Sequence, residues 1–217
     1  MWNNSEIKEI MIGSLLGNLH IERSKWKNKE GSIIEGNSRL LFKQEDTNVE
    51  YLMWIWKKFS SNGFVSTKKP KLYIRISKNN KVRYYYKLNS YSFVELNNYY
   101  NRFYISTSSG EKNIKVVPKD LDKDFTSLSL AVWFMDDGCI SGEGLKLNTN
   151  KYKKEEVEYL SINILKNLFN IVSSVNKLGN KDQYIIYIHK ESKKEFIKLI
   201  SSHLTEGMKD RKKINRR

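Results

Sequence analysis

The sequence predicts an α+β fold built from two αββαββα halves. Three observations predict it: an apolar helix opens each half, strands with alternating apolar residues follow, and amphipathic helices separate the strand pairs. The apolar helices end at Asn18 and Asp137, which lie 119 positions apart (137 minus 18). We therefore assign residues 1–117 to the first half and residues 118–217 to the second.

The first half begins with an apolar helix over residues 7–18, followed by a polar segment and a short strand over residues 39–43. The spacing of Thr47 and Glu50 is typical of a capping box and predicts the start of a second helix. That helix has apolar residues at helical spacing, which we expect to be buried: Tyr51, Leu52, Ile55, Trp56 and Phe59. A further helix over residues 91–104 closes this half.

Between these helices, residues 71–77 and 81–88 alternate in polarity on either side of Asn79 and Asn80. This pattern predicts a β-hairpin with one buried face, formed by Leu72, Ile74, Ile76, Val82, Tyr84, Tyr86 and Leu88. The opposite face is cationic and aromatic, with Lys71, Tyr73, Arg75, Lys81, Arg83, Tyr85 and Lys87. A two-stranded ribbon of this kind fits the DNA major groove, and the alternative is a solvated basic sheet face.

The second half repeats the plan, beginning with an apolar helix over residues 127–137. A strand over residues 145–150 places Lys146, Asn148 and Asn150 on one face. A long amphipathic helix then carries a stripe of Val157, Leu160, Ile164, Leu165, Leu168 and Val172. Residues 183–190 form another strand, and Ser192 with Glu195 resembles a capping box that opens the last helix.

The composition predicts a polyanionic partner. The chain has 39 Lys and Arg against 24 Asp and Glu, a net charge of +15, and phosphate neutralisation supplies most nonspecific affinity for nucleic acids. The alternative is a soluble surface in a Lys- and Asn-rich proteome. Cys139 is the only cysteine, so no internal disulfide forms, and the three histidines lack zinc-ligand spacing. Because neither a signal peptide nor an 18-residue apolar stretch is present, we expect an intracellular protein with no membrane segment.

The ends of the two apolar helices carry the chemistry. Gly13 and Gly17 lie one turn apart, and small residues at that spacing let a second helix approach closely. The other helix ends in Asp136-Asp137-Gly138. Acids at a helix C-terminus oppose the helix dipole, which indicates a function for them. The alternative interpretation is an acidic helix end with a glycine cap.

Residues 130–138, Leu-Ala-Val-Trp-Phe-Met-Asp-Asp-Gly, resemble the second motif of the single-chain, two-motif LAGLIDADG homing endonucleases. Residues 11–18 resemble the first motif with its acid changed. The stretches after the motifs are also similar to that family, at residues 39–44, 51–52, 147–150 and 155–160. The resemblance implies two pseudo-twofold-related halves, motif helices packed at their interface, antiparallel sheets that form a DNA-binding saddle, and a monomer.

The resemblance also implies roles for individual residues. Asp137 and Asn18 correspond to the catalytic metal ligands, and the metal implied is Mg²⁺ or Mn²⁺. Lys115 corresponds to a basic residue beside the reacting groups, and Arg211 falls at the matching place in the second half, with Lys209 and Lys212 as neighbours. The residues implied to contact nucleic acid are Lys43, Gln44, Lys71, Tyr73, Arg75, Lys81, Arg83, Lys146 and Asn148.

Asn18 departs from the family pattern, because its amide oxygen can touch a metal but adds no negative charge. Glu22 could substitute only if the helix continued past Asn18. The sequence leaves three interpretations open: a weakened or nicking endonuclease, a variant inactivated to trap a DNA complex, and a natural relative that binds without cutting. The leading expectation is a homing endonuclease acting on double-stranded DNA at an intron-insertion site. The alternatives are an intron RNA splicing maturase and a transcription-factor-like DNA binder. Because Lys and Asn are typical of AT-rich genomes, we expect a mitochondrion or another organelle rather than a bacterial cytoplasm.

Overall fold

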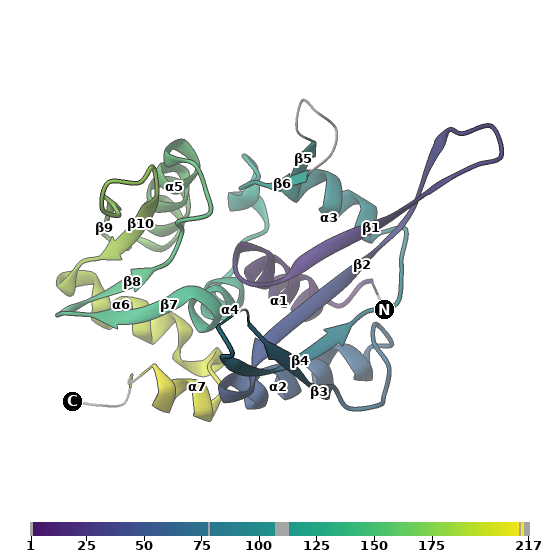
Figure 1. The fold of residues 1–217 in the computed structure, drawn as a ribbon. Coiled ribbons are helices and arrows are strands. Elements are labelled where there is room, and N and C mark those ends of the chain that lie inside the picture. The colour runs from purple at the N-terminus through teal and green to yellow at the C-terminus, as the bar shows by residue number, and fades with distance from the viewer. Residues whose placement is uncertain (1, 78, 107–112, 213, 215–217) are drawn as a thin grey trace. The chain divides into compact units, whose positions relative to one another are not determined.

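The computed structural model describes residues 2–77, 79–106, 113–212 and 214 (Figure 1). The order αββαββα occurs in both halves of the chain, so the predicted α+β plan is confirmed. The contacts nevertheless divide the chain differently from the repeat. Unit 1 comprises Met1–Ile7 and Asn18–Ile105, and unit 2 comprises Lys8–Gly17 and Ser106–Arg217. Most of the first helix thus packs within the unit formed by the second half.

Unit 1 is built on a four-stranded antiparallel sheet of order β1-β2-β4-β3. Its strands are β1 (His20–Lys27), β2 (Ile33–Glu45), β3 (Lys71–Ile76) and β4 (Val82–Asn89), and the unit ends within β5 (Tyr104–Ser106). Helix α2 (Val49–Ser61) packs on β2 and β4, and α3 (Leu96–Phe103) packs on β1 and β2. Phe59 contacts Phe42 and Phe64 in edge-on geometry, which places an aromatic core between α2 and the sheet.

The predicted capping box at Thr47 is wrong, because Asp46–Asn48 form a short 3-10 helix (η1) and α2 starts after it at Val49. The predicted buried face of the β3–β4 hairpin is also mostly wrong. Leu88 is buried, but the apolar residues nearer the turn are 44–66% exposed: Leu72, Ile74, Ile76, Val82 and Tyr84. The reason is that α2 packs on β2 and β4, whereas β3 is the edge strand of the sheet.

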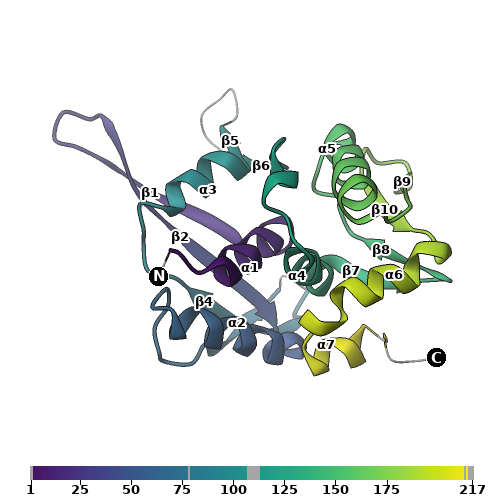
Figure 2. The same cartoon turned by 180° about the vertical axis from the view of Figure 1, so that it is seen from behind.

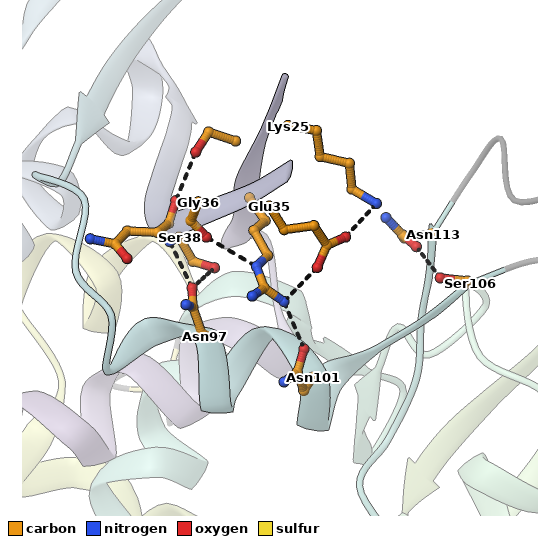
Figure 3. A network of polar contacts seen from close by, with 11 residues as sticks. Lys25, Glu35, Gly36, Ser38, Asn97, Asn101, Ser106 and Asn113 are labelled. Carbon is orange, nitrogen blue, oxygen red and sulfur yellow. Dashed lines mark hydrogen bonds and ion pairs between the residues drawn. The ribbon is translucent and has the colours of Figure 1, made fainter. Parts of the chain in front are cut away.

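The β1–β2 hairpin is longer than the single strand expected at residues 39–43 and extends beyond the rest of unit 1 (Figure 1). An ionic network holds it against α3 (Figure 3). Glu35 accepts from Arg23 at 2.9 Å and from Lys25 at 2.7 Å, and Arg23 also reaches Asn101 of α3. Beside it, Asn97 of α3 accepts hydrogen bonds from the backbone and side chain of Ser38.

Unit 2 contains the same strand order, β7-β8-β10-β9, in an antiparallel sheet. Its strands are β7 (Gly138–Ser141), β8 (Gly144–Leu147), β9 (Ser173–Lys177) and β10 (Tyr184–Ile188), with β6 (Asn113–Lys115) before them. Its helices are most of α1 (Ser5–Leu16), α4 (Ser127–Asp137), α5 (Lys154–Tyr159), α6 (Lys190–Ile200) and α7 (Glu206–Arg211), with the short turns η2 (Leu121–Lys123) and η4 (Ser201–His203). Along the described ranges no helix is long and apolar enough to cross a membrane.

Helices α1 and α4 lie side by side, as both views show (Figure 2). Gly13 makes this approach feasible, because a Cβ there would lie 2.9 Å from Cβ of Val132 and even closer to the carbonyl oxygen of Ser129. Ser129 Oγ donates to the carbonyl of Glu9 at 2.9 Å, and Thr126 Oγ1 donates to the Glu9 carboxylate at 2.7 Å. The close packing predicted from the small-residue spacing is therefore confirmed.

The predicted amphipathic helix after β8 is interrupted. Following α5, residues Leu160–Leu168 form a π-helix (η3), and Asn170 has a φ of 56° that ends it. The wider turn of a π-helix shifts side chains away from α-helical spacing. Val157, Leu160, Ile164 and Leu165 are buried as predicted, but Leu168 and Val172 are exposed. The expected capping box at Ser192 is also wrong, since α6 starts at Lys190 and Ser192 Oγ accepts from the backbone of Val172.

Candidate metal and nucleic-acid sites

The acid at the end of α4 faces the end of α1. Helix α4 ends at Asp137, and Gly138 begins β7 in an extended conformation (φ −87°, ψ 154°). A Cβ on Gly138 would overlap the ring of Phe134, so the glycine supplies space rather than a left-handed cap. Gly138 is the C-cap of α4, with its N–H bonded to the carbonyl of Phe134, so the expected glycine cap is present but is not left-handed. The Asp137 side chain is only 14% exposed.

Two oxygen atoms converge on one positive charge at this point. Lys151 Nζ lies 2.7 Å from the carbonyl oxygen of Gly17 and 3.0 Å from Oδ2 of Asp137. We call these two oxygens the oxygen pair. Gly17 is held against α4 so closely that a Cβ on it would overlap the Asp136 side chain. A carbonyl and a carboxylate around one cation are oxygen ligands of the kind that Mg²⁺ prefers.

Lys115, predicted as a basic residue of the site, lies at the same carbonyl. Its Nζ donates to Gly17 O at 3.1 Å. Burial, together with the nearby charge of Lys151, lowers the pKa of Lys115 to about 7, although Asp136 and Asp137 oppose the shift. A side chain with a pKa near neutrality can both accept and donate a proton at neutral pH.

In the second half the structure favours Lys212 over Arg211. Arg211 is exposed, whereas Lys212 Nζ donates to the carbonyl of Gly138, directly after Asp137. Burial lowers the pKa of Lys212, and Asp136 opposes this shift. Lys115 and Lys212 thus make equivalent contacts, each with a backbone carbonyl at the end of a motif helix.

Asn18 follows Gly17 in an exposed turn and belongs to unit 1. Helix α1 has already ended at Leu16, so the helix does not continue to Glu22. Glu22 lies in β1 and forms an ion pair with Arg39 of β2, which occupies its carboxylate on the sheet. Among the described residues no three or more His, Cys, Asp or Glu side chains are arranged to hold a metal ion. The oxygens at this point include the backbone carbonyl of Gly17, which shares its partner Lys151 with the Asp137 carboxylate.

A second feature, in unit 1, suits a polyanion. Directly paired residues of an antiparallel sheet share a face, and the register pairs Lys43 and Lys71 with Lys87, and Arg75 with Arg83. Tyr73 stacks on the paired Tyr85 between them. We call this surface the cationic face; it comprises Lys43, Lys71, Tyr73, Arg75, Arg83, Tyr85 and Lys87.

Like charges directly opposite one another destabilise a sheet, and Glu45 offsets only part of this through its ion pair with Arg83, so the remaining charges suit an anionic partner. Lys43 lies 4.3 Å from the ring centroid of Tyr85, and Lys87 lies 5.1 Å from that of Tyr73. These rings hold the ammonium groups on this face by cation–π attraction.

The other residues predicted to contact nucleic acid are less regular. Gln44 is buried on the opposite face and accepts a hydrogen bond from Asn48, and Lys81 is exposed in the turn before β4. Lys146 is half-buried and pairs with Tyr187 and Cys139 in the sheet of unit 2. Asn148 donates from its side chain to the carbonyl of Asp137, so it supports the acid.

Lys151 is the residue that the sequence did not reveal. It follows β8 in a loop, where neither alternation nor helical spacing marks it, and a single lysine is unremarkable in a chain so rich in lysine. Tyr85 and Lys87, in contrast, belong to the alternating pattern of the hairpin and were readable from it.

Comparison with known proteins adds four findings. The sequence matches the model of the LAGLIDADG DNA endonuclease family over residues 8–196. It is 39% identical over 208 residues to the cytochrome b mRNA maturase bI2 of Saccharomyces cerevisiae, covering 95% of this chain and 47% of that protein. It is 28% identical over 158 residues to the intron-encoded endonuclease ai4 of Dictyostelium discoideum, covering 71% of this chain and 95% of that protein. The solved structure of the homing endonuclease I-WcaI bound to its DNA recognition sequence is similar with a TM-score of 0.79 and 26% identity, covering 95% of this chain and 85% of that one. The chain thus spans about half the length of the Saccharomyces relative.

Proposed function

Because the chain belongs to the LAGLIDADG DNA endonuclease family, we propose that it is a metal-dependent, site-specific endonuclease that cuts double-stranded DNA at an intron-insertion site as a monomer. The observation that carries this proposal is the convergence of Gly17 O and the Asp137 carboxylate on one cation, beside Lys115. The cationic face supplies the sequence-independent attraction to phosphates on which such an enzyme depends. The similarity to cytochrome b mRNA maturases supports a mitochondrial location.

The donor set fits a divalent ion, since both oxygens already contact the Lys151 ammonium. Asp137 and Gly17 would hold Mg²⁺ or Mn²⁺ in our proposal, with Asn18 as a neutral ligand of the first motif. When bound, such an ion polarises a phosphoryl oxygen and lowers the pKa of a water molecule. Lys115 would move a proton at its Nζ, because its pKa is near 7. Lys212 would hold the equivalent position beside Gly138.

A second candidate function is an intron RNA splicing maturase on the same scaffold. Two relatives, 39% and 35% identical, are cytochrome b mRNA maturases bI2. Asn18 adds to this case, because a motif helix that ends without an acid weakens one of two cleavage sites but leaves the cationic face intact.

Cleavage of supercoiled plasmid that carries candidate insertion sites, in the presence of Mg²⁺, tests the first function. We expect nicked circles from the Asp137 site, linear product after Asn18→Asp, and a loss of about a hundredfold in rate for Asp137→Asn, since metal ligation contributes several kcal/mol to such reactions. Asp182→Asn, an exposed acid of the same unit, is the matched control and should leave the rate unchanged. Equal cutting by wild type and Asp137→Asn contradicts the proposal.

Competition binding separates the two functions. Labelled intron RNA and labelled insertion-site DNA are each titrated with the protein, and the other nucleic acid is then added as competitor. RNA binding that survives excess DNA, together with no cutting even by Asn18→Asp, favours the maturase. DNA binding that survives excess RNA favours the endonuclease.

A further inference from the structure

Lys151 occupies the position that a metal ion would need. Its ammonium bridges Gly17 O and Asp137 Oδ2, which are the two oxygens assigned to the ion under the proposed function. An ammonium and a divalent cation cannot share this position, because both need the same lone pairs and their charges repel. Lys115 Nζ also donates to Gly17 O, at 3.1 Å.

We propose that Lys151 is an internal cation that closes the oxygen pair in the absence of metal and must leave before a divalent ion binds. The inference rests on the proposed function, because it concerns the same metal site. Lys151 thereby raises the concentration of divalent ion at which the metal site fills.

The surroundings of Lys151 allow this displacement. Its side chain is 34% exposed, so the ammonium can reach solvent without unfolding of the unit. The adjacent Tyr152 offers a second position, since its ring centroid already lies 5.3 Å from Lys151 Nζ. Tyr152 itself is anchored, because its hydroxyl donates to the carbonyl of Leu16 at 3.0 Å. The lysine is therefore the movable partner and the ring is the stationary one.

With Lys151 in place, its ammonium balances the charge of the Asp137 carboxylate, and a hydrogen bond joins the loop after β8 to the end of α1. The site thus stays assembled without an ion. Such an arrangement permits binding of nucleic acid at low divalent-ion concentration and reserves the open oxygen pair for conditions in which the ion is abundant.

Mn²⁺ binding to the full chain without DNA, followed by the electron paramagnetic resonance signal of free Mn²⁺, tests the inference. Removal of the competing ammonium in Lys151→Met should tighten binding by about tenfold or more, because a charge-assisted hydrogen bond no longer has to be broken. Lys151→Arg keeps the charge and should bind Mn²⁺ as weakly as wild type. Lys154→Met removes an equal charge from an exposed pair with Glu158 and should change the affinity by less than about twofold.

A thermal melt provides a second readout. Lys151→Met should melt below wild type without metal, because Asp137 loses its partner, and Mn²⁺ should raise its melting temperature more than that of wild type. If Lys151→Met binds Mn²⁺ no more tightly than Lys154→Met, the inference is overturned, while a weakening of Mn²⁺ binding by Asp137→Asn would leave the proposed metal site standing. If Asp137→Asn has no effect in either background, the metal site of the proposed function itself fails.

Discussion

Replacement of Lys115 by Met should stabilise the folded protein at neutral pH. Burial lowers the pKa of Lys115 from 10.5 to about 7, so the folded state disfavours the charged amine. Between pH 7 and 10.5 the folded protein therefore binds fewer protons at this site than the unfolded chain, and its stability rises with pH across that window. Methionine fills a similar volume without a charge to desolvate.

The size of the effect follows from the shift. A difference of roughly 3.5 pH units, evaluated at pH 7 where the folded amine is half protonated, corresponds to an upper bound of about 4 kcal/mol. Residue 115 as a whole is only half-buried, so solvent screens part of this cost. Loss of the hydrogen bond to Gly17 O offsets a further part. We expect Lys115→Met to raise the free energy of unfolding by about 2 kcal/mol at pH 7.

Urea denaturation of wild type and Lys115→Met at pH 7, 8.5 and 10 measures this difference. The advantage of the variant should shrink steadily as pH rises and be nearly gone at pH 10.5, where the folded wild-type amine is neutral and the unfolded amine is only half protonated. Lys123→Met, at an exposed position of the same unit, should stay within about 0.5 kcal/mol of wild type at each pH. A variant that is less stable than wild type at pH 7, or a difference that does not change with pH, would refute the reasoning.

Three further predictions concern other parts of the chain. Gly13→Val should lower the free energy of unfolding by about 2–3 kcal/mol, because its Cβ meets the backbone of Ser129, and a fall in melting temperature checks this. Burial raises the pKa of Tyr104 to about 12, so the phenolate is disfavoured in the folded state. The free energy of unfolding of the wild type should therefore fall by up to about 3 kcal/mol between pH 10 and 12. Tyr104→Phe should not show this fall when alkaline denaturation is measured. Lys87→Gln should weaken DNA binding and reduce the slope of log affinity against log salt by about 1, whereas Lys57→Gln, on the exposed side of α2, should leave the slope unchanged.

The sequence predicted the helices best where one physical rule dominated. Helix α4 begins at Ser127 and ends at Asp137 as predicted, because its apolar run over residues 130–135 lies between the N-cap Thr126 and Gly138. Gly13 was likewise predicted to allow close approach of a second helix, and its packing against Ser129 confirms this.

The predictions failed where neighbours in space decide the outcome. Leu72 and Ile74 alternate as a buried face should, but no pattern in the strand tells whether a helix covers it. Leu168 lies on an α-helical stripe only if the helix keeps α-helical winding, and the π-helix removes it from the core. Lys151 was not predicted as a site residue because its contact is with the carbonyl of Gly17, 134 positions away in the chain.

Residues 8–17 belong to the core of unit 2, although the rest of that unit begins only at Ser106, about ninety residues later in the chain. A fragment of residues 106–217 would accordingly leave the apolar flank of α4 bare, and with it the surface that Gly13 fits. During synthesis on the ribosome, residues 8–17 emerge early. They cannot pack against α4 until the second half of the chain has also emerged. Chimaeras that exchange halves between relatives should therefore carry residues 8–17 together with the second half, and a peptide of that segment supplied in trans should rescue the fragment.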